Sequence, residues 1–511
     1  MKLYKNLILL GASALALTAC GAEDISSPGT GGNVTINNTT ATTLPAPTTP
    51  AGVTPASGCP TIADAQGLKD DGTITGPTGT WRVCTLPARV KTSITLTKIP
   101  GLLYQLPGRV DVGTDGGFTK TSADTNVTLT IQPGVIIYGG TGVSWLAVNR
   151  GNKISAVGTA TQPIIFTSRD NVLGLSTETS QGQWGGVVLL GRGKITDCTS
   201  GSTAGGTCER QTEGAADPAL FGGADDADNS GRMSYVQIRY SGYVLGADKE
   251  LQSLTTEGIG SGTVLDHIMS YNSSDDGAEF FGGVVNLKHY VSVGADDDSL
   301  DADTGIRGNF QYGLLLPRSG AGDALMEIDS NGFETDTPRS SLKISNYTAI
   351  QPAVSANNEA ADLAAILIRG NSDVTLANSV IVAPNNECLR LNGSGTTPAT
   401  LTARATVMTC NATTDLGAGS YTAAATASQF GAGANANRDD FVSTLTSLFI
   451  NGANENGVAA FDVASLGAFF SATTNIGAVK DSADNWWSGW TCSSAVASLG
   501  STSACTSLPT N

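Results

Sequence analysis

The feature that most constrains the fold is an internal repeat in the middle of the chain. Residues 264–283 align without a gap on residues 286–305, at a constant offset of 22. In this register the two histidines of the chain, His267 and His289, align with each other, and acidic residues of one repeat align with acidic residues of the other. Repeats of this length are typical of solenoids, in which one repeat forms one coil. Neighbouring coils pair about 4.8 Å apart, so equivalent side chains should stack in ladders.

Short β-branched segments extend this pattern on both sides of the repeat. Residues 126–131 alternate apolar and polar side chains, as a half-buried strand does, and Pro133-Gly134 follows as a turn. Similar segments recur as far as 401–407, without long helical patterns between them. We therefore predict an all-β solenoid with small caps. Its predicted parts are an N-terminal cap over 58–94, the solenoid over 95–415 and a partly helical C-terminal cap over 416–511.

Several segments resemble the right-handed parallel β-helix proteins of the pectate-lyase-like superfamily. The segments are 152–168, 184–191, 235–242, 274–283 and 296–298. More narrowly, the chain is similar to a family of secreted or lipid-anchored β-helix proteins of Gram-negative bacteria. The resemblance covers about 95–415 and implies a right-handed parallel β-helix. It implies no reaction, because that family has no assigned one.

The first 19 residues have the features of a secretory signal. Two cations, Lys2 and Lys5, precede an apolar run over 7–17, which is short for a membrane-spanning helix. Residues 17–20 (LTAC) resemble the lipobox of bacterial lipoproteins, which implies that Cys20 is diacylated and becomes the mature N-terminus. Gly21 is not aspartate, so the resemblance implies an outer-membrane location. The alternative is an ordinary signal peptide followed by an unrelated cysteine.

Residues 20–57 are predicted to form the lipidated end and a flexible tether. This stretch is rich in Thr, Pro, Ala and Gly and has no apolar period. Such a segment cannot bury enough surface to offset its conformational entropy. We therefore expect it to hold the folded body away from the membrane.

The eight remaining cysteines fall into four pairs that are local in sequence. An even number of cysteines in an exported chain favours disulfides, and neighbour pairing is natural for a fold made of local coils. The predicted pairs are Cys59–Cys84, Cys198–Cys208, Cys388–Cys410 and Cys492–Cys505. A metal–thiolate site is the alternative, but the chain has no CxxC spacing and its histidines are far from any cysteine.

Acidic residues concentrate between 225 and 303, in a chain whose net charge is −17. A field of this sign excludes a nucleic-acid binder that depends on phosphate attraction. The repeat places Asp275 beside Asp297 and Asp276 beside Asp298. Carboxylates about 4.8 Å apart repel by about 1 kcal/mol even in water, so a compensating cation is expected.

Calcium fits this expectation because it accepts six to eight oxygen ligands in flexible geometry. We predict a Ca²⁺ site whose ligands come from one set of acidic side chains. The set is Asp275, Asp276, Glu279, Asp296, Asp297, Asp298 and Asp301. The alternative is a region of solvated turns, in which aspartate is chosen as a turn former.

A catalytic interpretation of the same residues remains open. Asp275 and Asp276, followed by glycine, are similar to the paired carboxylates of β-helix polysaccharide hydrolases, where one acid protonates the leaving oxygen and another activates water. Lys288 is the candidate base of a lyase. Downstream of Asp276 the chain has neither the Gly-His-Gly nor the Arg-x-Lys motif of such enzymes. For His267 and His289 the simplest interpretation is a satisfied pair on one face, with metal or general-base roles as alternatives.

Together these features predict a lipid-anchored outer-membrane protein of a Gram-negative bacterium. Its partners should be the lipid bilayer, through Cys20, and a glycan, an envelope component or a protein. We expect a non-catalytic binding or structural module stabilised by Ca²⁺. The alternative function is that of a polysaccharide lyase or glycoside hydrolase using the carboxylates between 275 and 303.

Overall fold

The computed structural model describes residues within the larger of the chain's two units, Ala51–Asn511. The described residues are 52–213, 217–246, 249–330, 335–354, 364–392, 397–411, 415–500 and 503–510. The predicted signal segment 1–19, Cys20 and nearly all of the tether 20–57 lie outside these residues. Within them, no helix is both long and apolar enough to span a membrane.

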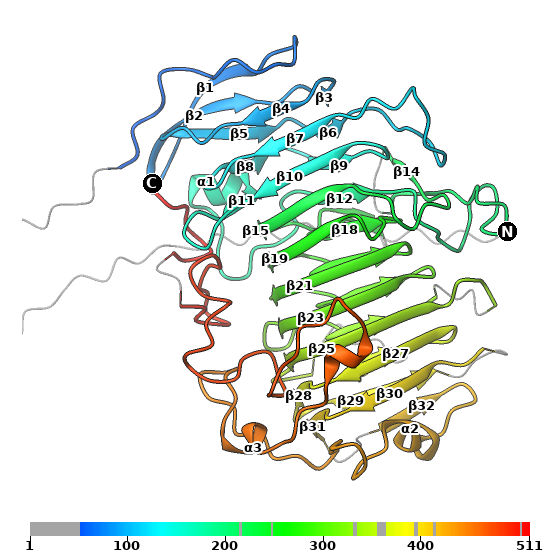
Figure 1. The fold of residues 1–511 in the computed structure, drawn as a ribbon. Coiled ribbons are helices and arrows are strands. Elements are labelled where there is room, and N and C mark those ends of the chain that lie inside the picture. Colours follow the sequence, from blue (N-terminus) through cyan, green and yellow to red (C-terminus); the bar gives the residue numbers. More distant parts are fainter. Residues whose placement is uncertain are drawn as a thin grey trace, which may run out of the picture. The chain divides into compact units, whose positions relative to one another are not determined.

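The unit is a parallel β-helix, in which strands of successive coils lie side by side (Figure 1). In the described part of the chain, one sheet has 17 strands. These are β1 (Lys69–Gly76), β2 (Gly79–Thr85), β4 (Ile94–Leu96), β5 (Leu102–Leu106), β7 (Thr128–Ile131), β8 (Ile136–Gly139), β10 (Lys153–Val157), β11 (Ile164–Ser168), β15 (Gly231–Arg239), β19 (Val264–Tyr271), β21 (Val284–Val293), β23 (Arg307–Leu316), β25 (Ser340–Ile350), β27 (Ser372–Ala377), β28 (Val380–Ala383), β30 (Thr400–Arg404) and β31 (Val407–Cys410). Among the described strands of this sheet, only β1 and β2 pair antiparallel.

A second sheet has eleven strands, all of them parallel among the described residues. These are β3 (Arg89–Val90), β6 (Arg109–Val112), β9 (Trp145–Val148), β12 (Gly186–Leu190), β18 (Leu254–Glu257), β20 (Ala278–Phe281), β22 (Asp301–Asp303), β24 (Met326–Ile328), β26 (Ala364–Ile368), β29 (Glu387–Asn392) and β32 (Asp415–Ala418). Two short hairpins leave the coils: β13 (Arg210–Gln211) with β14 (Leu220–Phe221), and β16 (Val244–Gly246) with β17 (Lys249–Glu250).

The predicted repeat corresponds to one coil. Leu265 of β19 pairs with Leu287 of β21, and Glu279 of β20 pairs with Asp301 of β22, both at the predicted offset of 22. The apolar side chains of such ladders point inward and form one continuous core along the helix. Burial of this inner face favours a fixed register, because a slip of one residue would turn the apolar side chains outward.

Each long strand of the larger sheet changes direction at one corner residue. Parallel pairing is interrupted at Tyr235, His267, His289, Tyr312 and Asn346, which all adopt left-handed backbone with φ between 53° and 65°. Non-glycine residues rarely adopt this conformation. Because each corner stacks on the next, five successive coils bend at one edge and their corner side chains form a ladder.

The disulfides confirm the local pairing expected from the sequence. Sulfur–sulfur bonds join all four predicted pairs. The bond between Cys388 and Cys410 connects residues of adjacent turns near the last coils, and Cys59–Cys84 ties the N-terminal segment to β2.

The region for which a C-terminal cap was predicted contains two different parts. Helix α2 (Ala423–Phe430) packs against β30 and β32 of the last coil, as a cap does. Residues 441–500 and 503–510, which we name the C-terminal strap, then run back along the β-helix towards α1 (Arg169–Leu173) (Figure 1). The strap includes α3 (Ala453–Asn456) and the 3₁₀ helix η1 (Val463–Leu466).

Candidate functional site: an acidic cavity

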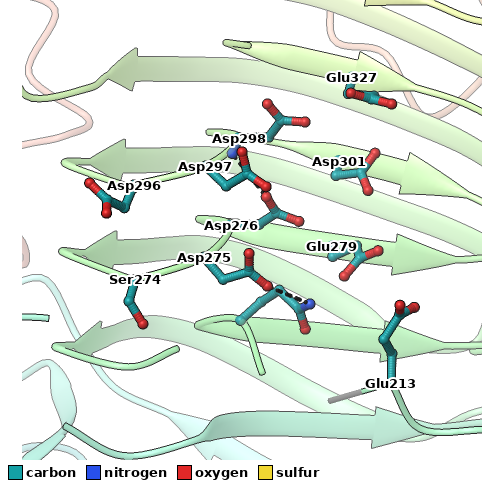
Figure 2. A pocket seen from close by; sticks show the side chains of 11 residues that line it. Glu213, Ser274, Asp275, Asp276, Glu279, Asp296, Asp297, Asp298, Asp301 and Glu327 are labelled. Carbon is teal, nitrogen blue, oxygen red and sulfur yellow. Dashed lines mark hydrogen bonds between the residues drawn. The ribbon is translucent and has the colours of Figure 1, made fainter. Parts of the chain in front are cut away.

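The predicted acidic residues line one cavity of about 400 Å³ beside the second sheet. It is formed where the chain turns from β19 into β20 and, one coil later, from β21 into β22. Figure 2 shows most of the carboxylates of these two coils around a common space, with Asp296 standing apart from them. The lining residues are Glu213, Gln252, Ser274, Asp275, Asp276, Glu279, Asp296, Asp297, Asp298, Asp301 and Glu327.

Local backbone explains why both turns present their acids in the same way. Asn272 and Gly294 open the two turns in left-handed conformation, with φ of 52° and 74°. Gly277 closes the first turn against the next coil: a Cβ atom there would lie 2.3 Å from Ser292 Oγ and 2.6 Å from Ser299 O. The close approach of the two coils brings their carboxylates together.

Two groups of three carboxylates converge in the cavity. In the first group, oxygens of Asp275, Asp276 and Asp297 lie within 4.8 Å of one another. In the second, oxygens of Asp276, Glu279 and Asp301 do the same, so Asp276 belongs to both. Asp276 is fixed in place because its Oδ1 accepts a hydrogen bond of 2.9 Å from the backbone N–H of Asp298.

The cluster is buried and its carboxylates raise one another's pKa. Asp276 and Asp298 are each 5% exposed, and Glu279 is 7% exposed. Burial raises the pKa of Asp276 well above its usual range, and the charges of Asp275 and Asp301 raise it further. Burial and the charge of Asp301 likewise raise the pKa of Glu279 well above its usual range. Without a cation, the cluster therefore holds protons at pH values where exposed carboxyls have lost them.

Cations occur at the rim of the cavity. Arg318 lies 2.7 Å from a carboxylate oxygen of Asp296, and Arg369 lies 2.8 Å from one of Glu327. Among the described residues that line the cavity itself, none is lysine or arginine. The central carboxylates thus share a space that the protein lines mainly with negative charge.

The donor set fits a hard divalent cation. All the donors of both groups are carboxylate oxygens, the ligand type that Ca²⁺ prefers. An ion with oxygen ligands at about 2.3–2.6 Å brings those oxygens to within about 5 Å of one another. The separation of at most 4.8 Å in each group meets this condition before any side chain moves. Because Asp276 belongs to both groups, two ions could share its carboxylate.

The predicted ligands all line this cavity, and the sequence did not predict several of its other lining residues. All seven predicted acids line the cavity, although Asp296 faces Arg318. Glu327 lies opposite Asp301 in the next coil, but an insertion moves it 26 residues along the chain and hides it from a fixed period of 22. Glu213 lies in the connection between β13 and β14, which is outside the repeat and gives no sequence signal.

The structure does not bring Lys288 into this cavity. Its Nζ donates a hydrogen bond of 2.9 Å to Ser471 Oγ of the strap and lies 4.9 Å from the centre of the Phe469 ring. The predicted catalytic residues are therefore divided: Asp275 and Asp276 line the acidic cavity, whereas Lys288 contacts the strap.

The histidine pair forms a separate group with Asp266. The rings of His267 and His289 stack with centres 4.1 Å apart and planes 27° apart. The Nδ1 atoms of His289 and His267 lie 2.7 and 2.9 Å from the same oxygen, Asp266 Oδ1. Ligand atoms of these three residues all lie within 4.8 Å of one another. Burial alone would raise the pKa of Asp266, but its contacts with the two imidazoles lower it well below the usual range.

Comparison with known proteins gives one positive result. The family model described as a pectate-lyase-like β-helix domain matches residues 118–491. This range contains both the acidic cavity and the histidine pair. No curated protein and no solved structure matches the chain.

Proposed function

Because the chain belongs to the family of pectate-lyase-like β-helix domains, we propose that its β-helix is a non-catalytic binding module stabilised by Ca²⁺ in the acidic cavity. The ligand class of the module is a glycan, an envelope component or a partner protein. The observation that carries the calcium proposal is the pair of carboxylate groups that share Asp276 across two coils.

Calcium would act here as a clamp between coils. Each group combines carboxylates of two neighbouring coils, so one ion would hold both in register. Binding would remove the repulsion between buried like charges and replace their protons. An ion that binds the folded state stabilises it by mass action, by about 2.7 kcal/mol at one hundred times its Kd.

The cavity favours binding over lyase chemistry. A lyase needs a base that removes a proton next to a carboxylate of the substrate, and the described lining of the cavity offers neither lysine nor arginine. A glycoside hydrolase is the second candidate, because the raised pKa of Asp276 suits a general acid beside an ionised partner.

The location proposed for the module is the outer membrane. The basis is the resemblance of residues 17–20 to a lipobox, with acylated Cys20 as the anchor and residues up to 57 as the tether. The four disulfides agree with an oxidising compartment outside the cytoplasm.

Melting curves with Ca²⁺ and with a chelator test the proposal. We expect calcium to raise the melting temperature of the wild type by several degrees. It should have much less effect on Asp276→Asn, which removes the shared carboxylate. Asp440→Asn, a change at an exposed acid outside the cavity, is the control and should respond like the wild type.

Two results would contradict the calcium clamp. One is a wild-type melting temperature that is the same with calcium and with chelator. The other is turnover of a polysaccharide that Asp276→Asn abolishes while the calcium response is unchanged; that result would support the hydrolase instead.

A further inference from the structure

A second cavity lies between the C-terminal strap and the coils that contain β11 and β15. It has a volume of about 440 Å³ and shares no lining residue with the acidic cavity. Ile165 of β11 and Gln237 and Arg239 of β15 line one side, and residues of the strap line the other. The lining includes two cations, Lys98 and Arg239, and its described residues include no aspartate or glutamate.

Arg239 differs from the other buried arginines in its partners. Arg150, Arg192 and Arg239 are each at most 2% exposed. Arg150 lies 2.6 Å from a carboxylate oxygen of Asp115, and Arg192 lies 2.8 Å from one of Asp124. Arg239 forms no ion pair with any residue that the structure describes. A buried charge without a counterion lowers stability, so an anion beside Arg239 would be favourable.

The hydrogen bonds of Arg239 orient its guanidinium but do not neutralise it. Nε and Nη2 each donate to Oε1 of Gln237, and Nη1 donates to the backbone oxygens of Cys505 and Ser507. All of these acceptors are neutral. A guanidinium has five N–H groups, so one N–H of Nη2 remains without a partner among the described residues.

Lys98 adds a second cation to the same cavity. It follows β4, and its backbone N–H donates a hydrogen bond of 3.0 Å to Oε1 of Gln132, which holds this segment in place. Burial lowers the pKa of Lys98 and lowers that of Arg239 to about 10, because no nearby carboxylate opposes the effect in the described part of the chain. Arg239 therefore still carries its charge at neutral pH.

The rest of the lining favours an organic anion over an inorganic one. Pro163, Ile165 and Pro509 give the cavity an apolar portion, and Thr161 and Ser503 supply hydroxyls. A volume of about 440 Å³ is in the range of small-ligand sites and exceeds what a sulfate or phosphate ion needs. An apolar wall gains nothing from a hydrated inorganic ion, whereas it can contact the hydrocarbon part of an organic acid.

We infer that this cavity binds a small organic acid, whose carboxylate pairs with Arg239 and Lys98 and whose hydrocarbon part contacts the apolar portion of the lining. Charge-assisted hydrogen bonds are stronger than neutral ones, and exclusion of water strengthens them further. The net charge of −17 opposes long-range attraction of an anion, so these two local cations have to supply the affinity. The inference goes beyond the proposed function, because it concerns a separate cavity and does not require calcium.

Melting curves of the whole folded protein with sodium benzoate and with sodium hexanoate test this inference. The reference is sodium chloride at the same ionic strength, and chelator is present throughout. We expect at least one carboxylate to raise the melting temperature of the wild type, with a concentration dependence that gives an apparent Kd. Lys98→Met should weaken that Kd about tenfold, and Lys98→Glu, which puts an anion into the cavity, should abolish the shift. Arg239→Gln also removes bonds to the strap, so the Lys98 variants carry the test.

Lys153→Met is the matched control. Lys153 is an exposed lysine at the start of β10 and does not line the cavity. Its removal changes the net charge by the same amount as Lys98→Met, so a general effect of charge would appear in both variants. We expect its apparent Kd to equal that of the wild type. Each shift is measured from the variant's own melting temperature in chloride, so a less stable variant still gives a Kd.

Sodium sulfate at the same ionic strength separates the two kinds of anion. Sulfate stabilises most folded proteins because it is excluded from their surface, so it should shift Lys98→Met as much as the wild type. A sulfate shift that Lys98→Met abolishes would overturn the inference in favour of an inorganic anion.

Two further results would show that no organic acid binds here. One is a wild-type melting temperature that neither carboxylate raises above the chloride reference. The other is an apparent Kd that is the same in Lys98→Met as in Lys153→Met. Asp276→Asn should respond to the carboxylates like the wild type, because it alters only the acidic cavity, and the calcium clamp and this inference can therefore fail separately.

Discussion

Asp276 is the residue at which the chemistry of the acidic cavity is concentrated. It belongs to both carboxylate groups, is 5% exposed and is fixed by the backbone of Asp298. Burial and neighbouring charges raise its pKa and that of Glu279. Proton binding and cation binding are thus alternative ways to neutralise the same oxygens.

This competition predicts an unusual pH dependence for the calcium-free protein. Carboxyls with a raised pKa bind protons more tightly in the folded than in the unfolded state. Their contribution to stability is complete below the unfolded pKa, near 4, and is lost as pH rises through the folded values. With chelator, the melting temperature should therefore fall as pH increases from about 4 towards neutrality. Calcium should reduce this fall.

Urea unfolding at several pH values, with and without calcium, measures both effects. Asp276→Asn should show a shallower fall than the wild type in chelator. A wild-type stability that rises steadily over this pH range in chelator would contradict the assignment of raised pKa values to the cluster.

At the scale of elements, the C-terminal strap holds the outer face of the larger sheet. Trp490 is fully buried and meets His267 edge-on, with ring centres 5.4 Å apart. Gln237 donates a hydrogen bond to the backbone oxygen of Trp490, and Arg239 donates to the oxygens of Cys505 and Ser507. The strap therefore supplies acceptors for a buried arginine as well as apolar cover.

Removal of the Trp490 side chain should loosen this cover. Trp490→Ala is expected to lower the free energy of unfolding by about 3–5 kcal/mol, the usual cost of deleting a large buried aromatic group. Trp487→Ala should cost less because Trp487 is half-exposed. Urea denaturation gives the values, and limited proteolysis should cut the strap first in Trp490→Ala. Equal stability of the two variants would show that the strap is only loosely attached.

The elements differ in how far the sequence predicts them. The coil length, the pairing of Glu279 with Asp301 and the four disulfides all depend on residues that are close in the chain, so spacing reveals them. The path of the strap depends on contacts between residues more than 200 positions apart, such as Gln237 with Trp490. Such contacts leave no periodic signal. The sequence did not predict Glu213 as a lining residue either, because its position in the cavity leaves no periodic signal.

At the scale of the whole molecule, the net negative charge and the proposed lipid anchor together affect how close the folded body comes to the membrane. The chain carries a net charge of −17, and the proposed acyl anchor would hold this acidic body near a membrane at the end of a long tether. The tether would keep the two apart, since an acidic protein and an anionic surface repel within a Debye length.

The anchor itself can be tested directly. Cys20→Ala should abolish incorporation of labelled palmitate and move the protein from the membrane fraction to the soluble fraction of cells. The melting temperature of the folded body should stay the same, because residue 20 precedes it. Membrane association that persists without Cys20 would exclude acylation as the cause and point to another contact.

The return of the strap to the early coils also has a consequence for the proposed export of the chain. Coils of a β-helix can form one after another as a polypeptide emerges from a translocation pore, because each needs only its predecessor. Arg239, however, finds its backbone acceptors at residues 505 and 507, more than half the length of the chain later. During the proposed export, the flank of the early coils that the strap covers would therefore stay exposed until the last residues of the chain arrive.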